Sequence, residues 1–446
     1  MAGGFRQPPR ALRMRPFAGP SVWLEFTPLS KLTSSVNLGQ GAPGWASPPF
    51  VKKALVKACQ DDSYCQYARS AGAPVLVEQI ARQYAPKVLP STMKSRKIDP
   101  ATEIVVTVGA SQAISLACTA LLQEGDEAIL IEPAFDMYTA AVQMAGATPV
   151  YIPFRSRSNG AIATANDLCV DLEDLENAVT EKTRMFVLNT PHNPLGKVFS
   201  RDELIEIADV LDRKAPSCIV MSDEVYEHLV FEGEHVPFAS VSENAFDRTL
   251  SIYSFGKTFS STGTKIGWVV GPHNLIRDLQ IAQQFVVFCT NHMGQAAAAE
   301  ALELSQAPYD NFSTYFDWIC DVYRKKRDFL VEVIRAAGLE PIVPQGAFYI
   351  CARVPDGHPL KEKTGVPEKV QELVKEGKLQ IDPGTVDRSD YNISRRLVVQ
   401  KGVTTIPISA FVKPELVGES ALSKDFIRFA FCHPDHVLKE ASRRLR

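Results

Sequence analysis

The chain has 446 residues, of which 45% are hydrophobic and 22% charged, and its formal net charge at pH 7 is −3. These values are ordinary for a globular protein, and the length allows two domains around a large buried core. The small net charge gives no general affinity for nucleic acid or anionic membranes, and no apolar run is long enough to span a bilayer. The nine cysteines are scattered without a CxxC pair, which favours reduced thiols over disulfides or a zinc site.

The N-terminal arm is basic, because its first twenty residues contain Arg6, Arg10, Arg13 and Arg15 and no acidic residue. This pattern partly resembles a mitochondrial transit peptide. However, prolines interrupt the amphipathic helix that such a peptide forms, and hydroxyl residues are absent. We therefore predict a disordered arm on a cytoplasmic protein, with mitochondrial import as the alternative.

Between residues 101 and 272, short β-rich runs alternate with helical stretches. The predicted strands are Ile104–Val108, Ala128–Ile131, Pro149–Ile152, Met185–Leu188, Cys218–Met221, Thr249–Tyr253 and Ile266–Val270, and the predicted helices are Gln112–Leu122, Met137–Met144 and Arg201–Leu211. Such alternation predicts an α/β fold with a mainly parallel, seven-stranded sheet covered by helices on both faces. Ligands of such sheets bind in the loops beyond the strand ends.

After residue 296 the pattern changes to that of a smaller α+β domain. We predict one long helical stretch at Ala296–Ala337, a charged, solvated and peripheral insertion at Pro355–Arg396, and strands at Ala347–Cys351, Leu397–Ile408 and Phe426–Phe431. The predicted division is a large domain at 46–295 and a small domain at 296–446. The N-terminal arm, residues 1–45, is expected to join the small domain.

The run Ser254-Phe-Gly-Lys257, followed by Lys265, is the strongest chemical signal. A lysine directly after an apolar strand lies at the ligand-binding edge of the sheet, and in a desolvated pocket its amine becomes a nucleophile toward an aldehyde. Ser254 and Lys265 suit a phosphate oxyanion. A lone loop lysine is usually a solvated surface charge, but its neighbours favour the functional interpretation.

Asp223 and Tyr226 also follow an apolar strand directly. A carboxylate there can keep a pyridine nitrogen protonated, and Tyr226 can reach the phenolic oxygen of the same ligand if the segment curls helically. Asn193 lies in a turn shaped by Pro and Gly residues and offers amide donors to the ring oxygen or to a substrate carboxylate. The structural alternatives are that Asp223 only caps a helix and that Asn193 lies in an ordinary surface turn.

Two weaker signals precede these motifs. Ala110 and Ser111 follow Gly109 at a strand–helix joint, where backbone N–H groups bind phosphate. Phe135 can stack on an aromatic ring, although a single Phe is more often a core residue. Near the C-terminus, Arg428 lies among phenylalanines on a short apolar strand. Because burying an unpaired arginine is costly, it either pairs with a protein carboxylate or binds a substrate carboxylate.

The runs NTPHNPLGKVF, SDEVYE, SFGKTFSSTGTKIGW and RFAF together resemble a fold-type I, class I/II aminotransferase that uses pyridoxal phosphate (PLP). The runs NLGQGAP, VTVGASQA and EGDEAILIEPAFDMY are more narrowly similar to the kynurenine aminotransferases, a branch that includes glutamine transaminase K and cysteine-conjugate β-lyase. The resemblance covers the chain from about Trp23 to the C-terminus. It implies transamination of kynurenine, within tryptophan catabolism, with a 2-oxo acid acceptor.

The resemblance also implies roles for particular residues. Lys257 is expected to carry the cofactor and shuttle the proton, Asp223 to hold the pyridine nitrogen, and Tyr226 and Asn193 to hold the ring hydroxyl. Further implied contacts are Phe135 on the ring; Ala110, Ser111, Ser254 and Lys265 on the phosphate; Arg428, Asn193 and the Gly39 backbone on the substrate carboxylate; and Trp23 as a pocket wall. A homodimer with shared sites is expected, in which Tyr67 reaches the partner's phosphate and Phe288 lies in the partner's pocket.

Two positions depart from the pattern of animal members. Ser111 stands where some of them have an aromatic residue, and Cys289 where they have a histidine. The preference among kynurenine, glutamine, methionine and phenylalanine therefore stays open. The alternatives are a cysteine-conjugate β-lyase, a general aromatic or glutamine aminotransferase, and, more remotely, a non-enzymatic PLP-binding regulator. A dinucleotide-binding oxidoreductase is disfavoured because the sequence has no GxGxxG after a strand.

Overall fold

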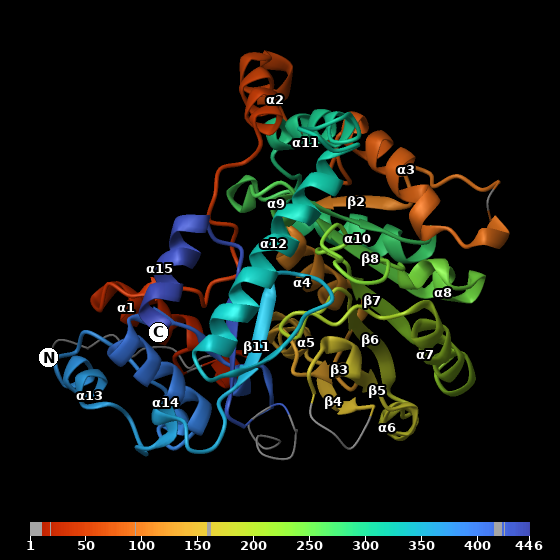
Figure 1. Cartoon of the computed structure of the whole chain (residues 1–446). Coiled ribbons are helices and arrows are strands. Elements are labelled where there is room, and N and C mark those ends of the chain that lie inside the picture. Colours follow the sequence, from red (N-terminus) through yellow and green to blue (C-terminus); the bar gives the residue numbers. More distant parts are fainter. Residues whose placement is uncertain (1–10, 18, 94, 158–161, 414–421, 423) are drawn as a thin grey trace, which may run out of the picture.

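An eight-stranded sheet forms the centre of the protein, whose computed structural model describes residues 11–17, 19–93, 95–157, 162–413, 422 and 424–446 (Figure 1). In spatial order its strands are β2 (Ile104–Thr107), β9 (Gly267–Val270), β8 (Thr249–Ser254), β7 (Ile219–Asp223), β6 (Thr183–Asn189), β3 (Glu127–Glu132), β4 (Thr148–Ser156) and β5 (Leu168–Val170). The pairs β8–β7, β7–β6, β6–β3 and β3–β4 are parallel, whereas β9 runs antiparallel to both of its neighbours. The predicted, mainly parallel α/β sheet is confirmed; the unpredicted eighth strand is β5, a three-residue edge strand antiparallel to β4.

Helices cover both faces of this sheet, which explains why its central strands are apolar throughout. One face is covered by α4 (Ala110–Leu121), α5 (Asp136–Met144) and α10 (His273–Val286). The other is covered by α3 (Pro74–Val88), α6 (Leu172–Ala178), α7 (Arg201–Lys214) and α8 (Glu243–Arg248). Alternate residues of one strand take opposite sides, since Leu130 packs with α4 and α5 whereas Ile129 packs with α6 and α7. α7 starts at a capping box in which Ser200 and Glu203 bond to each other's backbone N–H.

The C-terminal part forms a second, antiparallel sheet beside the first (Figure 1). Its strands, in spatial order, are β10 (Glu340–Ile342), β11 (Tyr349–Arg353), β14 (Phe426–Ala430) and β13 (Ile406–Pro407). The N-terminal segment joins this part, because β1 (Val36–Asn37) pairs in parallel with β12 (Val403–Thr404). The remaining helices are α1 (Val22–Leu32), α2 (Pro49–Gln60), α9 (Phe255–Thr258), α11 (His292–Leu304), α12 (Tyr315–Ala336), α13 (Glu368–Lys375), α14 (Ser389–Arg396) and α15 (Asp435–Leu445). The domain boundaries at residues 45 and 295 stay a prediction.

The single helical stretch predicted at Ala296–Ala337 is wrong, because the chain breaks between α11 and α12. Pro308 lies in this break and cannot continue a helix. Asp310 has a positive φ of 53°, and α12 begins anew where the Thr314 side chain accepts a hydrogen bond from the Asp317 N–H. The strand predicted at Leu397–Ile408 is also partly wrong, since Leu397–Lys401 continues α14 as a π-helical turn before the two-residue strands β12 and β13.

The charged segment Pro355–Arg396 is not a peripheral, solvated insertion throughout, because every residue of α14 from Asp390 to Arg396 is buried. Arg395 is fully buried and forms a bidentate ion pair with Glu25 of α1, at 2.6 and 3.0 Å. Charge alone predicted exposure for this segment, whereas here the charged side chain pairs across two elements far apart in sequence. The ion pair between Arg395 and Glu25 therefore connects α1, through α14, to the small sheet.

Two further expectations concern the ends of the chain and membranes. Arg6 and Arg10 of the basic arm lie outside the described residues. Within the described ranges, every helix is too short or too polar to cross a bilayer.

Candidate active site

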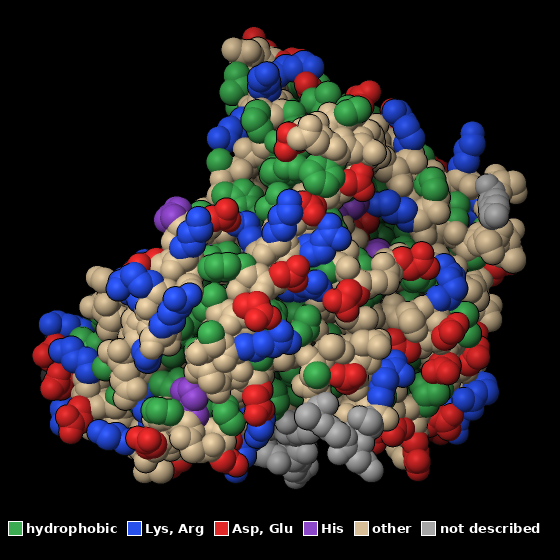
Figure 2. Space-filling view, in the orientation of Figure 1, with side chains coloured by type: hydrophobic (Ala, Val, Ile, Leu, Met, Phe, Trp, Pro, Cys, Tyr) green, Lys and Arg blue, Asp and Glu red, His purple; other side chains and the backbone are tan. Residues whose placement is uncertain are grey.

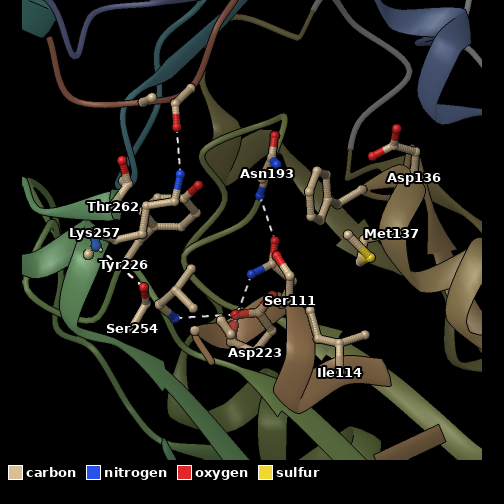
Figure 3. A pocket seen from close by; sticks show the side chains of 18 of the residues that line it. Ser111, Ile114, Asp136, Met137, Asn193, Asp223, Tyr226, Ser254, Lys257 and Thr262 are labelled. Carbon is tan, nitrogen blue, oxygen red and sulfur yellow. Dashed lines mark hydrogen bonds between the residues drawn. The ribbon is translucent and has the colours of Figure 1, made fainter. Parts of the chain in front are cut away.

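A cavity of about 510 Å³ lies where three neighbouring strands of the large sheet end (Figure 3). Asn189 is the last residue of β6, Asp223 of β7 and Ser254 of β8, and all three line the cavity. Parallel strands bring these ends to one edge of the sheet. The residues selected from the sequence that line the cavity are Trp23, Ala110, Ser111, Phe135, Asn193, Asp223, Tyr226, Ser254, Lys257, Lys265 and Arg428.

Lys257 lies in α9, the short helix that follows β8, and its amine is inside the cavity. The Nζ atom donates to the carbonyl oxygen of Gly41 at 2.5 Å and lies 5.3 Å from the ring centre of Phe348. Burial lowers the pKa of Lys257 from its ordinary value to about 8, and the positive charges of Arg428 and Lys265 act in the same direction. A neutral, nucleophilic amine is therefore accessible near physiological pH.

Asp223 is 4% exposed, and its carboxylate accepts a hydrogen bond from the Tyr138 hydroxyl at 2.6 Å. Burial raises the pKa of Asp223 to about 6, while the bond from Tyr138 and the charge of Lys257 oppose the rise. Among the described residues, no Lys or Arg forms an ion pair with this carboxylate. A buried acid of this kind is stabilised in its charged form by a cationic ligand.

The turn that carries Asn193 is fixed to the same strand ends. The Asn189 side chain accepts from the Asn193 N–H at 2.7 Å and donates to the Asp223 carbonyl at 2.9 Å. The Tyr226 hydroxyl lies 3.0 Å from the Tyr349 hydroxyl, and burial raises its pKa well above the usual value. Asn193 and Tyr226 are thus held as neutral hydrogen-bonding groups over the cavity (Figure 3).

One end of the cavity is suited to an anion. α4 begins there after Gly109, which has a φ of +76°, and the first N–H groups of a helix have no partner within it. The Nζ atom of Lys265 lies at the same place, 3.3 Å from the position that a Cβ on Gly109 would occupy. The backbone of Lys265 is in the left-handed region, at φ +56°. The Ser254 hydroxyl accepts from the Lys257 N–H at 3.4 Å and still has its own proton to donate. These donors match a phosphate.

Arg428 of β14 is 1% exposed, yet within the described parts of the chain it pairs with no carboxylate. Its guanidinium donates to Asn193 Oδ1 at 2.9 Å and to the Gly39 carbonyl at 2.8 Å, and its Nε has no partner. The group lies 4.3 Å from the ring centre of Tyr349. Of the two interpretations of Arg428, the described residues supply no carboxylate for an ion pair, and an anion-binding arginine fits the geometry.

Tyr67 and Phe288 do not line this cavity. Their rings contact each other edge to face at 4.9 Å on the surface, where Tyr67 is 80% and Phe288 51% exposed. Their contribution to the site of a second copy of the chain stays a prediction.

The cavity residues that were not selected from the sequence include Asp136, Tyr138 and Tyr349. Tyr138 follows Phe135 by three residues in a helix, so its spacing could have suggested a shared face. Asp136 accepts a hydrogen bond from Trp23 Nε1 at 2.8 Å, and no sequence pattern links two residues so far apart. Tyr349 comes from β11 of the small sheet and carries no local signal.

The sequence matches the family Aminotransferase class I and II over residues 33–445. The chain belongs to that family. This aminotransferase is 38% identical to the kynurenine–oxoglutarate transaminase of Dictyostelium discoideum, over 95% of this chain and 93% of the relative. It is also 38% identical to human kynurenine–oxoglutarate transaminase 3, over 94% of this chain and 86% of the relative. The crystal structure of Bna3p from Saccharomyces cerevisiae superposes with a TM-score of 0.85 at 26% identity, covering 99% of this chain and 98% of that one.

PLP is the cofactor of this aminotransferase, and the residues present fit it. The cavity combines an anion-binding end, a buried carboxylate that needs a cationic partner, and an amine whose pKa is lowered to about 8. These three features correspond to the phosphate, the ring nitrogen and the aldehyde of PLP. The described residues contain no cluster of three or more His, Cys, Asp or Glu side chains placed to hold a metal ion.

Proposed function

We propose that this aminotransferase transfers the amino group of L-kynurenine to a 2-oxo acid, and so leads to kynurenic acid. Glutamine, methionine and aromatic amino acids are further proposed donors. The observation that carries the proposal is the buried Arg428, which has no carboxylate partner among the described residues and shares one cavity with Lys257. Such a pair binds the α-carboxylate of an amino acid and works on its Cα. The similarity to two kynurenine–oxoglutarate transaminases supports kynurenine as the donor.

In the proposed holoenzyme, PLP supplies an electron-withdrawing pyridine ring and an aldehyde that reacts with amines. Lys257 is the covalent attachment point and carries the proton to and from the substrate Cα. Asp223 binds the ring nitrogen, Tyr226 and Asn193 the ring hydroxyl, and Phe135 stacks on the ring. The phosphate contacts come from the Ala110 and Ser111 backbone, Ser254 and Lys265. Gly267 packs closely against the start of α4 and so holds it in place, because a Cβ on Gly267 would lie 2.8 Å from the Ala110 nitrogen.

The substrate is held on the other side of the cavity. Arg428 binds the α-carboxylate, assisted by the Asn193 amide, while its own bonds to Asn193 and Gly39 keep it oriented. Trp23 forms a wall, since its ring lies 5.6 Å from the Arg428 guanidinium. The aromatic lining of the pocket also limits the access of water during proton transfer.

A homodimer with shared active sites is part of this proposal. Large apolar side chains are exposed at the end of α10 and just beyond it, with Phe285 at 81%, Val286 at 60% and Phe288 at 51%. Apolar groups gathered in this way are typical of a protein interface. Tyr67 lies against Phe288 and would extend into the partner's phosphate site, as the homology implies.

We further propose a cytoplasmic location, with the mitochondrion as the alternative. All nine cysteines are free, which suits a reducing compartment. The basic arm is the argument for import.

The test is a donor panel assayed with PLP-loaded protein and its Lys257→Ala variant. The wild-type protein should convert kynurenine in proportion to the 2-oxo acid supplied, whereas Lys257→Ala should lose transamination yet stay folded, because its role is covalent. Borohydride should fix PLP to Lys257 in the wild type alone. Lys369→Ala, at an exposed site, is the matched control. Pyruvate release from a cysteine conjugate without an amino acceptor would instead favour the β-lyase, and a wild type that binds PLP without turnover would favour the regulator.

A further inference from the structure

Asp136 has no role in the chemistry described so far, yet it lines the substrate side of the cavity. It is the first residue of α5, directly after Phe135. Figure 3 shows Asp136 and Met137 on one side of the pocket and Lys257 on the opposite side, with Asn193 in the middle. A substrate held by its α-carboxylate on Arg428 and by its Cα near Lys257 extends its side chain toward this remaining wall.

The carboxylate of Asp136 is only partly satisfied. Among the described residues, it accepts one side-chain hydrogen bond, from Trp23 Nε1 at 2.8 Å to Oδ2. Burial raises its pKa, whereas the bond from Trp23 and the positive charge of Arg428 lower it. The backbone N–H groups of Met137 and of Asp136 itself also bond to this carboxylate. A carboxylate has about four acceptor sites, so it can still accept a hydrogen bond from a ligand in the cavity, which it lines beside Trp23, Phe135 and Met137.

A partly buried carboxylate discriminates strongly between ligand groups. An N–H group placed against it forms a charge-assisted hydrogen bond, whereas a second carboxylate is repelled and loses its hydration. Trp23 adds direction, because its indole N–H donates only and so fixes one carboxylate oxygen.

We propose that Asp136 determines the substrate preference of this aminotransferase: its carboxylate accepts a hydrogen bond from a side-chain N–H of the amino donor and repels a side-chain carboxylate. The favoured donors carry an arylamine or a carboxamide, and the disfavoured ones are acidic amino acids. The same wall meets the amino acceptor, so monocarboxylic 2-oxo acids are preferred to dicarboxylic ones. This inference rests on the proposed function.

The experiment is a cycle of two substrates and two proteins. The substrates are L-kynurenine and its analogue without the ring amino group; the proteins are the PLP-loaded wild type and Asp136→Asn. In the variant, Trp23 Nε1 takes the amide oxygen, which turns the NH₂ group toward the substrate. We expect kcat/KM for kynurenine to fall roughly tenfold or more, while the value for the analogue changes less than about twofold.

A second pair of near-isosteric donors, L-glutamine and L-glutamate, tests the repulsion. Asp136→Asn should lower kcat/KM for glutamine and raise it for glutamate, each by roughly tenfold. Changes of opposite sign in one protein are not produced by a general loss of folding or of cofactor. The matched control is Asp247→Asn on α8, which is exposed and should change neither ratio.

Equal loss for both members of each pair, or no gain with glutamate, overturns the proposal. If Asp136→Asn does not fold, Asp136→Glu replaces it: it keeps the charge, so glutamate stays excluded, but its longer side chain should lose the arylamine contact. The wild-type protein also tests the proposal by itself, because equal kcat/KM values for kynurenine and its analogue would refute the contact between Asp136 and the ring amino group. A wild type inactive with kynurenine overturns the proposed function, whereas the glutamine–glutamate pair still tests Asp136.

Discussion

Replacing Arg395 by Met should destabilise the protein more than most single substitutions. Arg395 is fully buried and makes five hydrogen bonds, two to Glu25, two to Thr385 and one to Asn392. Its removal leaves the Glu25 carboxylate, 2% exposed, without its cation. Breaking a buried ion pair in this way costs about 3–5 kcal/mol of unfolding free energy. A methionine fills much of the volume, so the loss of charge pairing dominates.

The assay is urea unfolding of the PLP-loaded wild type and variant, followed by fluorescence. Arg335→Met is the control, because Arg335 pairs with Glu332 at the surface, where the two side chains are 53% and 70% exposed, and such pairs contribute about 0–1 kcal/mol. Adding Glu25→Leu to Arg395→Met should recover most of the loss, since it removes the stranded charge. A loss below about 1 kcal/mol, or no recovery in the double variant, would refute the reasoning. Because Trp23 shares α1 with Glu25, KM for the amino donor should rise as well.

Two further predictions concern the reacting groups. Tyr138→Phe removes the hydroxyl that donates to Asp223 and so should raise the pKa of Asp223 further above its value of about 6. Because a hydrogen bond to a charged group contributes roughly 1.5–3 kcal/mol, PLP should dissociate about tenfold faster from the variant. The acid limb of the pH profile of kcat should move to higher pH. An unchanged acid limb would contradict it. Cofactor-free protein should take up PLP faster as pH rises and level off above about 8, because burial lowers the pKa of Lys257 to about 8 and the neutral amine is the reactive form. A midpoint near the ordinary lysine value of 10.5 would contradict it.

The sequence predicted the large sheet and its ligand-binding edge well, for a physical reason. Parallel strands buried on both faces are short, continuous apolar runs, and the polar residues that follow them, such as Asp223 and Lys257, stand out against this background. The order of these residues along the chain also placed them on neighbouring strands. The prediction therefore needed no knowledge of distant contacts.

The predictions that failed, or were not made, mostly depend on contacts between residues far apart in the sequence. Arg395 was assigned to a solvated segment because its burial depends on Glu25, from the other end of the chain. Tyr349 reaches the cavity from β11 of the small sheet, and Asp136 pairs there with Trp23 of the distant helix α1; no local period encodes either contact. The break between α11 and α12 could have been predicted, because Pro308 marks it directly.

The place of Trp23 near the beginning of the chain limits how the N-terminus can be processed or engineered. α1 starts at Val22, and its first turns carry both the pocket wall and the Glu25 anchor. A peptidase that removes the basic arm must therefore cut upstream of this helix. A cut at about Ser21 keeps both Trp23 and Glu25, whereas a cut one helical turn later removes Trp23 from the pocket wall and Glu25 from its ion pair with Arg395 of α14.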